Sequence, residues 1–465
     1  STRKESSAAS DVYKRQGNNI RIKNPTEQIK DYAETNLVMK NPQYEQLQRL
    51  GKWTGNTPQY LAWYEIDGKD LILPFGCLQD LFKMYPAECF KNNIVLGEKQ
   101  KYKSNINLFN YQEEVVNKAI SKRNGIIVMP AGSGKTQTAL ELIARLGFKT
   151  LWITHTIDLL NQSYNRAKDN MEGVGLGKIA SGKVEIGTHI TFATVQTLKS
   201  IDLQEYADTW DCIVVDEAHR ICGTPASTGM FYKVINKLVA RYKFGLTATP
   251  YRNVKGTERA MFSLLGNTII EIDKSVVADR IVQATIHKVI TEFEDIPDDC
   301  IEFDGTLKYS TLTTALAEDK KRNDLILDLL EQCKDEYTLV LGDRVGQLYS
   351  LQEKLGYGNV IDGKTKKDIR ENAIQEVRDG KVKVLFATYG LAKEGLDIPR
   401  LSRLILASPH RDKATIIQSV GRIERKFENK TNPIVYDLVE PILYYENMWK
   451  TRKSYYRKNG NEILE

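Results

Sequence analysis

The chain has 465 residues, of which 41% are hydrophobic and 27% are charged. These fractions are typical of globular proteins, and the length allows about three domains of roughly 150 residues each. No stretch approaches the ~20 consecutive apolar residues of a membrane-spanning helix, so we expect none. The net charge of +6 permits a nucleic-acid partner without demonstrating one. The 6 cysteines show no CxxC or Cys/His ligand spacing, which favours free thiols in a reducing cytoplasm over disulfides or a zinc site.

The N-terminal part differs in character from the rest of the chain. Residues 1–16 read STRKESSAASDVYKRQ, without an initiating Met, an apolar segment or any periodicity. We interpret them as a non-native or adaptor-derived leader, with a natural disordered tail as the alternative. Residues 17–104 contain short aromatic and polar runs punctuated by prolines, which predicts a small α+β accessory domain.

From about Asn110 onward, short β-branched runs alternate with longer helical stretches, a pattern typical of a parallel sheet covered by helices. The runs are apolar throughout, as expected for strands buried on both faces. They form two series, which predicts α/β domains over residues 105–285 and 322–445, a linker or insertion at 286–321 and a C-terminal helix or tail at 446–465. The predicted strands cover residues 125–129, 150–154, 190–195, 211–215, 243–246, 337–341, 383–387, 401–407 and 433–438.

The strongest motif is GIIVMPAGSGKT at residues 125–136, where an apolar run leads into glycines and then into a helical pattern. This context predicts a phosphate-binding P-loop, although Met129 replaces the first glycine of the usual pattern. Glycines let backbone N–H groups turn toward phosphate oxygens, and the helix N-terminus adds partial positive charge. Lys135 would reach the β- and γ-phosphates of ATP, and the Thr136 hydroxyl would bind Mg²⁺. The predicted ATP-binding residues of the loop are Pro130, Ala131, Gly132, Ser133, Gly134, Lys135 and Thr136.

Two acids, Asp216 and Glu217, follow the predicted strand that ends at residue 215. In an open parallel sheet this carboxyl end is the ligand-binding edge. Asp216 would hold Mg²⁺ through its water shell, and Glu217 would polarise the attacking water. The alternative is a helix N-cap followed by an acid in the first turn. The presence of a P-loop favours the metal site.

With both halves of a nucleotide site present, residues 107–439 resemble the DEAD/DEAH-box type helicases of superfamily 2, in a pattern similar to the UvsW-type phage helicases and the XPB group. The resemblance implies two tandem RecA-like parallel-sheet P-loop domains that use ATP and Mg²⁺. The matching segments, in the family's order, are YQ at 111–112, ITHTIDLLNQ at 153–162, ATVQTL at 193–198, LTATP at 246–250, VLGDR at 340–344, AT at 387–388, GLDIP at 395–399 and QSVGRIER at 418–425.

The resemblance also implies roles for single residues. Tyr111 and Gln112 would read the adenine, although Phe109 stands where many relatives carry Arg. Gly395 and Asp397 would add further nucleotide contacts. A structural role is the alternative for Thr194, Thr249 and Thr388, and packing is the alternative for His155. The expected nucleic-acid contacts are His155, Thr194, Thr249, Arg344 and Thr388, and the expected coupling residues are His219, Thr247 and Thr249.

Gln418, Arg422 and Arg425 are the catalytic residues expected from the second domain. Charge on the transferred phosphoryl group calls for a bidentate cation, which Arg supplies better than Lys. The two arginines lie about one turn apart, which predicts that both project from one face of a helix. An arginine finger of this kind is worth on the order of 10³–10⁵ in rate. The alternative is a solvated helix surface.

The subfamily resemblance favours DNA as the track. DEAD-box RNA helicases carry Asp where His219 stands and Ser-Ala-Thr where residues 247–249 read Thr-Ala-Thr, and residues 41–77 resemble the accessory domain of UvsW-type helicases. The function so implied is an ATP-dependent helicase or translocase on duplex or branched DNA, in replication, recombination or repair. It would work in the cytoplasm of a prokaryotic or phage-infected cell, alongside replication or recombination proteins. The alternatives are a restriction-type motor subunit that translocates without unwinding, an RNA helicase and a catalytically silent binding protein.

Two aromatic and basic segments could contact bases directly. Residues 444–458 (YYENMWKTRKSYYRK) could stack on single strands, but an amphipathic helix that packs its aromatic residues on the second domain is the favoured interpretation. In the accessory domain, Lys52 with Trp53 and Trp63 with Tyr64 could stack at a junction. We expect at least one of these two tryptophans in the core of the small domain.

Overall fold

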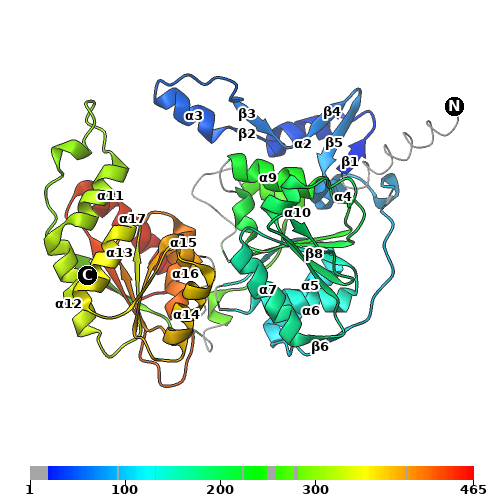
Figure 1. The fold of residues 1–465 in the computed structure, drawn as a ribbon. Coiled ribbons are helices and arrows are strands. Elements are labelled where there is room, and N and C mark those ends of the chain that lie inside the picture. The colour runs from blue at the N-terminus through cyan, green and yellow to red at the C-terminus, as the bar shows by residue number, and fades with distance from the viewer. Residues whose placement is uncertain are drawn as a thin grey trace. The chain divides into compact units, whose positions relative to one another are not determined.

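The computed structural model describes residues 19–91, 94–130, 132–222, 225–248, 258–276, 281–393, 396 and 398–465. The chain forms two compact units, and it passes from the first to the second between Asp273 and Lys274 (Figure 1). The leader predicted at residues 1–16 lies outside the described residues. In the part of the chain that the structure describes, no helix has the length and apolar character needed to cross a membrane.

The first unit is built on an eight-stranded sheet with the strand order β11-β10-β12-β8-β13-β14-β7-β15. All neighbours are parallel except β10 and β11, and every residue of β7, β8, β12 and β13 is buried. The prediction of strands buried on both faces is therefore confirmed. The strands are β7 (Asn124–Val128), β8 (Thr150–Thr154), β10 (Leu176–Ala180), β11 (Lys183–Val184), β12 (Ile190–Thr194), β13 (Cys212–Val215), β14 (Tyr242–Thr247) and β15 (Thr268–Glu271).

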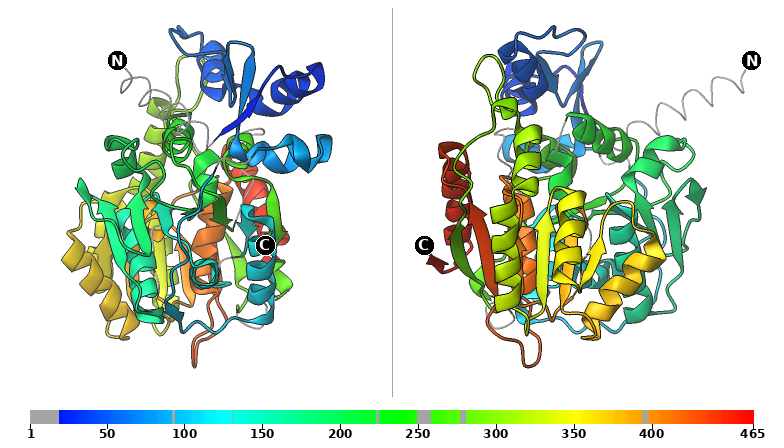
Figure 2. Two further views of the ribbon diagram at one scale, coloured as in Figure 1. Left: turned by 90° about the vertical axis from the view of Figure 1, so that its right-hand side faces the viewer. Right: turned by 60° about the vertical axis from the view of Figure 1, so that its left-hand side comes forward.

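Helices pack on both faces of this sheet (Figures 1 and 2). Their apolar stripes explain the packing, since α6 buries Ala139, Leu140, Leu142, Ile143 and Leu146 at helical spacing. The helices are α5 (Asn110–Lys122), α6 (Lys135–Leu146), α7 (Ile157–Asn170), α8 (Val195–Ser200), α9 (Pro225–Ile235) and α10 (Glu258–Leu265).

The N-terminal region has the mixed α and β composition that was predicted, and it packs on α10. A Cβ on Gly76 would overlap the carbonyl oxygen of Phe262, so the two backbones are in close contact. Arg259 of α10 also donates to the carbonyl oxygens of Thr35 (2.7 Å) and Val38 (2.8 Å). The elements are a sheet of β1 (Asn19–Ile22), β5 (Asp70–Pro74) and β4 (Glu65–Asp67), the strand pair β2 (Val38–Lys40) and β3 (Tyr60–Ala62), and the helices α2 (Glu27–Leu37), α3 (Pro42–Arg49) and α4 (Leu78–Met84).

The second unit is built on a seven-stranded, all-parallel sheet with the order β18-β19-β17-β20-β21-β16-β22. Two segments outside the range predicted for this domain contribute strands to it, namely β16 from the predicted linker and β22 from the predicted tail. Both were hard to recognise because β22 is only two residues long and β16 is only partly buried. The strands are β16 (Thr285–Ile290), β17 (Thr338–Gly342), β18 (Asn359–Ile361), β19 (Val384–Thr388), β20 (Arg403–Leu406), β21 (Ile434–Val439) and β22 (Ile463–Leu464).

Residues 309–332 form two helices and not one, because Asp319 interrupts the helical path. The Asp319 side chain accepts from the backbone N–H of Arg322 (2.7 Å) and so begins a new helix by N-capping. The helices of this unit are α11 (Tyr309–Glu318), α12 (Lys320–Gln332), α13 (Val345–Leu355), α14 (Lys367–Arg378), α15 (Tyr389–Lys393), α16 (Lys413–Ile423) and α17 (Leu443–Lys458).

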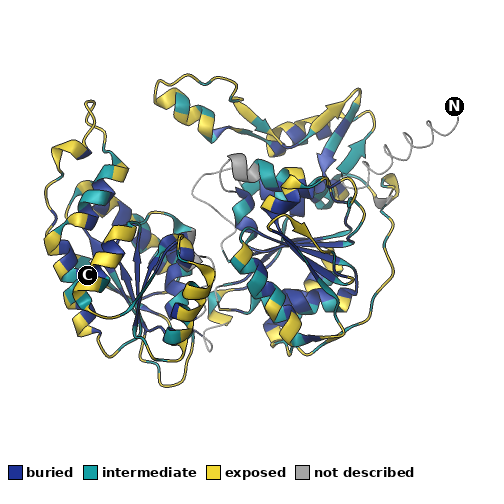
Figure 3. Ribbon diagram, viewed as in Figure 1, coloured by how far each residue is buried: buried dark blue, intermediate teal, exposed yellow. Residues whose placement is uncertain are grey.

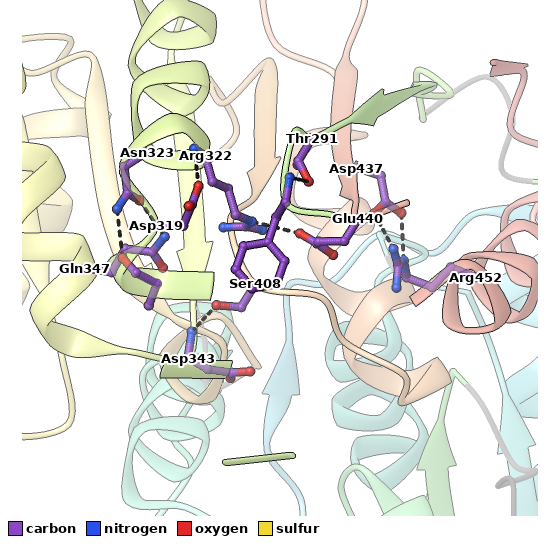
Figure 4. A network of polar contacts seen from close by, with 12 residues as sticks. Thr291, Asp319, Arg322, Asn323, Asp343, Gln347, Ser408, Asp437, Glu440 and Arg452 are labelled. Atoms are coloured by element: carbon purple, nitrogen blue, oxygen red, sulfur yellow. Dashed lines mark hydrogen bonds and ion pairs between the residues drawn. The ribbon is translucent and has the colours of Figure 1, made fainter. Parts of the chain in front are cut away.

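The aromatic C-terminal helix α17 packs on the second sheet. Tyr445, Met448, Trp449 and Tyr456 are buried, which confirms the packing interpretation of this segment. The same region holds two buried ion pairs, Arg322 with Glu440 and Arg452 with Asp437, each at 2.8 Å (Figure 4). Removing one partner of such a pair leaves an uncompensated buried charge, so these pairs restrict substitution in the second unit.

Candidate active site

The loop between β7 and α6 has the backbone shape of a phosphate-binding turn. Gly132 and Gly134 have φ values of +80° and +79°, a left-handed conformation that glycine adopts without steric cost. Gly134 is also the N-cap of α6. A Cβ on Gly134 would lie 2.6 Å from Nε2 of Gln112, so this position needs glycine for a second reason. Ala131 lies outside the described residues.

Gln112 connects the predicted adenine-reading motif with this loop. Its side chain is buried, and Oε1 accepts from the backbone N–H of Phe109 (3.0 Å), which caps α5 and leaves the amide nitrogen beside Gly134. Phe109 stacks parallel to Tyr111, with ring centroids 6.2 Å apart and planes 8° apart. The aromatic residue at position 109 thus extends the surface of Tyr111, a contact that the sequence analysis did not foresee.

Lys135 and Thr136 open the first turn of α6. The Lys135 ammonium lies 3.4 Å from the carbonyl oxygens of Met129 and Pro130, so the lysine folds back over the loop. A cation over inward-turned N–H groups at a helix N-terminus is the arrangement that binds phosphate.

The acid pair stands at the carboxyl end of β13. Glu217 has a φ of +50°, which is uncommon for a residue other than glycine, and its N–H donates to Oδ1 of Asp216 (3.0 Å). Backbone strain of this kind costs on the order of 1–3 kcal/mol and clusters at functional sites. It turns two consecutive side chains toward the same edge of the sheet.

Burial and charge act differently on the two acids. Burial raises the pKa of Asp216, and the adjacent charge of Glu217 raises it further. Burial also acts to raise the pKa of Glu217. The hydrogen bond from His219 and the positive charges of His219 and Lys135 outweigh burial, so the pKa of Glu217 is lowered. A bound cation would stabilise the charged forms of both carboxyl groups at once.

His219 links the acid pair to the next strand. Its ring is buried, and Nδ1 lies 3.2 Å from Oε2 of Glu217 and 3.1 Å from Oγ1 of Thr247, the last residue of β14. The carbonyl oxygen of Thr247 accepts from the N–H of Met129 at the start of the phosphate loop (2.9 Å). The predicted coupling residues His219 and Thr247 are therefore in contact, and Thr249 lies outside the described residues.

Two predicted nucleic-acid contacts of the first unit are held by neighbouring residues. Gln196 donates to the carbonyl oxygen of His155 (2.8 Å), and the His155 ring lies 6.5 Å from that of Phe231. The buried hydroxyl of Thr194 lies 3.0 Å from that of Thr197. Gln196 belongs to the ATVQTL segment, but this contact with His155 was not predicted.

In the second unit, Arg344 is bound by its own chain. Its Nε donates to Oγ1 of Thr314 (2.9 Å), and Nη2 donates to the carbonyl oxygen of Ser310 (2.6 Å), both on α11. These bonds use Nε and Nη2, so a phosphate contact by Arg344 would come from the N–H groups of Nη1. Thr388 ends β19, while Gly395 and Asp397 lie outside the described residues.

The prediction that Arg422 and Arg425 share a helical face is wrong. Gln418 and Arg422 lie on α16, but this helix ends at Ile423, and Arg425 forms a β-bridge with Ile281. The chain leaves the helix because the side chain of Glu424 turns inward. Its carboxylate is buried and accepts from Lys274 (2.9 Å) and from the Asn461 amide (2.8 Å).

Lys430 holds this turn from the other side. Its ammonium donates to the carbonyl oxygens of Ile423 (2.6 Å), Arg425 (2.7 Å) and Pro399 (3.1 Å). It therefore ties both flanks of Glu424 to the GLDIP segment. The contacts of Lys430 were not predicted, because no periodicity shows that a lysine reaches back to carbonyl groups five and seven residues earlier.

The residues present fit ATP and Mg²⁺ by their chemistry. The phosphate loop offers backbone donors and one lysine, and Thr136 and Asp216 offer the hard oxygen ligands that Mg²⁺ prefers. The buried carboxyl of Asp216, with its raised pKa, is a group that a cation would stabilise.

Two family models match the chain. The model described as type III restriction enzyme, res subunit, matches residues 105–252, and the model described as helicase conserved C-terminal domain matches residues 321–426. The putative ATP-dependent RNA helicase L396 of Acanthamoeba polyphaga mimivirus is 28% identical over 73% of this chain and 64% of its own length. The DNA 3'-5' translocase XPB2 of Sulfurisphaera tokodaii is 26% identical over 70% of this chain and 80% of its own length.

Among solved structures, the ATP-dependent Type ISP restriction-modification enzyme LlaBIII bound to DNA aligns with 80% of this chain and 31% of its own, with a TM-score of 0.56. At 17% identity this likeness supports the fold alone. The family models match one region in each unit, and the relatives extend across both. This chain therefore belongs to the superfamily 2 helicases, a family of ATP-dependent helicases, and is related to the XPB group.

Proposed function

We propose that this protein is an ATP-dependent helicase or translocase that acts on duplex or branched DNA in replication, recombination or repair. One observation carries the ATP-driven part of the proposal. The strands β13, β14 and β7 are adjacent and parallel, so the acid pair, Thr247 and the phosphate loop follow neighbouring carboxyl ends. The contact from His219 to Glu217 and to Thr247 connects them.

Each residue then has a definite task in hydrolysis. The N-terminus of α6 and Lys135 bind the phosphate oxygens, and Thr136 and Asp216 hold Mg²⁺. When bound, Mg²⁺ neutralises charge on the β- and γ-phosphates. Glu217 orients the attacking water and accepts its proton. We also assign polar and cationic side chains of the second unit to this reaction, namely Gln418, Arg422 and Arg425.

The choice of DNA rests on the relatives. Several are named as XPB-type DNA helicases or translocases, among them proteins from Sulfurisphaera tokodaii and Mycobacterium tuberculosis. The names of two other matches favour the alternatives of an RNA helicase and a restriction-type motor. The mimivirus relative is named as an RNA helicase, and the model that matches residues 105–252 is named after a restriction enzyme subunit.

The test compares ATPase rate and strand separation on single-stranded DNA, duplex DNA, forked DNA, a four-way junction and RNA. We expect DNA to stimulate the ATPase and forked or branched DNA to be remodelled. Equal rates with and without any nucleic acid would contradict the motor function. Stimulation by duplex with displacement of a third strand, but without unwinding, would indicate the restriction-type motor. Stimulation by RNA alone would indicate an RNA helicase.

A further inference from the structure

A small lobe of the N-terminal region lacks a hydrophobic core of its own. We define the α3 lobe as residues 38–62, which comprise β2, α3, the loop 50–59 and β3. The strands β2 and β3 pair, with Lys40 opposite Tyr60, and α3 has no buried residue. In Figures 1 and 3 the helix and its loop stand out from the rest of the N-terminal region, and much of their surface is exposed.

Hydrogen bonds nevertheless fix the shape of the loop. The side chain of Asn41 is buried, donates to the carbonyl oxygen of Pro58 (2.8 Å) and accepts from the N–H of Gln43 (3.0 Å). Its own N–H donates to the carbonyl oxygen of Gln59 (2.9 Å). The N–H of Lys52 also donates back to α3, at the carbonyl oxygen of Leu47 (2.9 Å). The lobe is therefore an ordered platform.

Trp53 stands on this platform with its ring exposed. Its exposed fraction is 89%, whereas the other tryptophans of the chain, Trp63, Trp152, Trp210 and Trp449, are between 0% and 7% exposed. Part of the ring edge lies against Gly55, where a Cβ would be 3.1 Å from the ring atom Cζ3. The rest of the indole surface is open. An indole in water contributes little to folding, and a large exposed aromatic surface in an ordered loop is suited to contact with a ligand.

The charges of the lobe indicate which ligand fits. Lys40, Arg49 and Lys52 are exposed and Glu45 is the lone acid, so residues 38–62 carry three positive charges against one negative. Among the residues that the structure describes, no ion pair engages these three cations. By contrast Phe303, whose ring is also highly exposed, lies between Glu302 and Asp304 in a short acidic turn. An exposed aromatic surface with cations beside it is suited to binding nucleic acid, whereas acidic side chains repel the phosphates.

We propose that the α3 lobe is a nucleic-acid contact outside the helicase motifs, where the Trp53 ring stacks on an unpaired base and Lys40, Arg49 and Lys52 bind the flanking phosphates. The inference rests on the proposed function and names the form of its substrate. Base faces inside a continuous duplex are covered by their neighbours, so the ring selects single strands, ends, gaps and forks. Stacking of a base on an aromatic side chain does not depend on sequence, because every base has a π-face.

The test uses the full-length chain without ATP. Because only Trp53 is exposed among the tryptophans, acrylamide quenches its fluorescence selectively, and bound oligo(dT) should both quench and protect it. Replacing Trp53 by Ala should weaken oligo(dT) and forked-DNA binding about 5- to 150-fold, the range for one stacked base. Trp53→Phe should retain part of the affinity. Lys52→Ala should lower the slope of log affinity against log salt by about 0.7 on single strands.

Phe303→Ala is the matched control, since it removes an equally exposed aromatic ring and should leave binding unchanged. Equal affinity of wild type and Trp53→Ala for oligo(dT) and forks would overturn the proposal. So would a Trp53 signal that responds to protein concentration, which would show a protein contact instead. A failure of the proposed function is separate, because it would be seen as an unstimulated ATPase in the wild type.

Discussion

His219 and Thr247 are in hydrogen-bonding contact, with 3.1 Å between Nδ1 and Oγ1, although 28 residues separate them in the chain. The contact joins the acid pair after β13 to the carboxyl end of β14. Thr247 itself belongs to the LTATP segment, so one buried histidine contacts both this segment and Glu217.

The first prediction removes that contact. Thr247→Val keeps the shape of a fully buried side chain and deletes the hydroxyl. We expect ATP binding to be retained and the nucleic-acid-stimulated ATPase to fall about 5- to 30-fold, the loss for one buried hydrogen bond of about 1–2 kcal/mol. Thr338→Val is the matched control, because Thr338 is equally buried in β17 and its hydroxyl has no hydrogen-bond partner among the described residues. A similar loss in both variants would contradict the coupling role.

The second prediction concerns Glu217. Glu217→Gln keeps the size of the side chain and removes the carboxylate that would take the proton from water. Hydrolysis should fall on the order of 10²–10⁴-fold, the range for a general base, while ATP binding measured by equilibrium dialysis stays near that of the wild type. The exposed Glu371→Gln on α14 is the control. A hydrolysis rate close to that of the wild type would exclude Glu217 as the base.

The third prediction tests the phosphate loop. Gly134→Ala introduces a Cβ 2.6 Å from Nε2 of Gln112 at a residue with φ +79°. The left-handed backbone alone costs about 1–2 kcal/mol, and the contact distorts the loop in addition, so ATP affinity should fall at least 10-fold. Gly356→Ala has a similar φ of +80° with nothing within 4 Å and lies outside the phosphate loop, so it controls for the stability cost of a left-handed alanine. Isothermal titration with an ATP analogue measures both variants, and an affinity of Gly134→Ala equal to that of the wild type would contradict the phosphate-binding role of the loop.

The sequence alone predicted those parts of the fold and the site that depend on local pattern. Buried strands show as apolar runs, and the phosphate loop shows as glycines between a strand and a helix. The positive φ of Glu217 leaves no such trace, because any residue type can be forced into it by its surroundings. Arg425 was placed on a helix from spacing, and the inward turn of Glu424, which ends that helix, depends on Lys274 and Asn461 far along the chain.

The fourth prediction concerns Lys430 as a positioning residue. Its ammonium donates to carbonyl groups on both sides of Glu424, so Lys430→Met should release the turn that carries Arg425. We expect kcat for ATP to fall about 10- to 100-fold, as for small misplacements of reacting groups, with a smaller change in KM. Lys430→Arg should restore part of the rate, since it keeps the donors. The exposed Lys450→Met is the control, and a loss of thermal stability without a change in kcat would indicate a purely structural role.

The fifth prediction is a dependence of stability on pH that arises from Lys243. This lysine is buried in β14, with its ammonium 4.5 Å from the centre of the Phe75 ring, and burial lowers its pKa to about 7. In the unfolded chain the same group keeps its proton up to about pH 10. Between these values the unfolded state binds more protons, so raising the pH stabilises the folded first unit, by at most about 1.4 kcal/mol per pH unit.

Below about pH 7 the lysine is charged in both states, and the full cost of burying it is present. Lys243→Met removes this cost. The gain in its free energy of unfolding over the wild type, measured in urea, should therefore be largest near pH 7 and should vanish toward pH 10. The exposed Lys237→Met should show no such trend. Parallel stability curves for the wild type and Lys243→Met across this range would show that the buried ammonium keeps its proton in the folded protein.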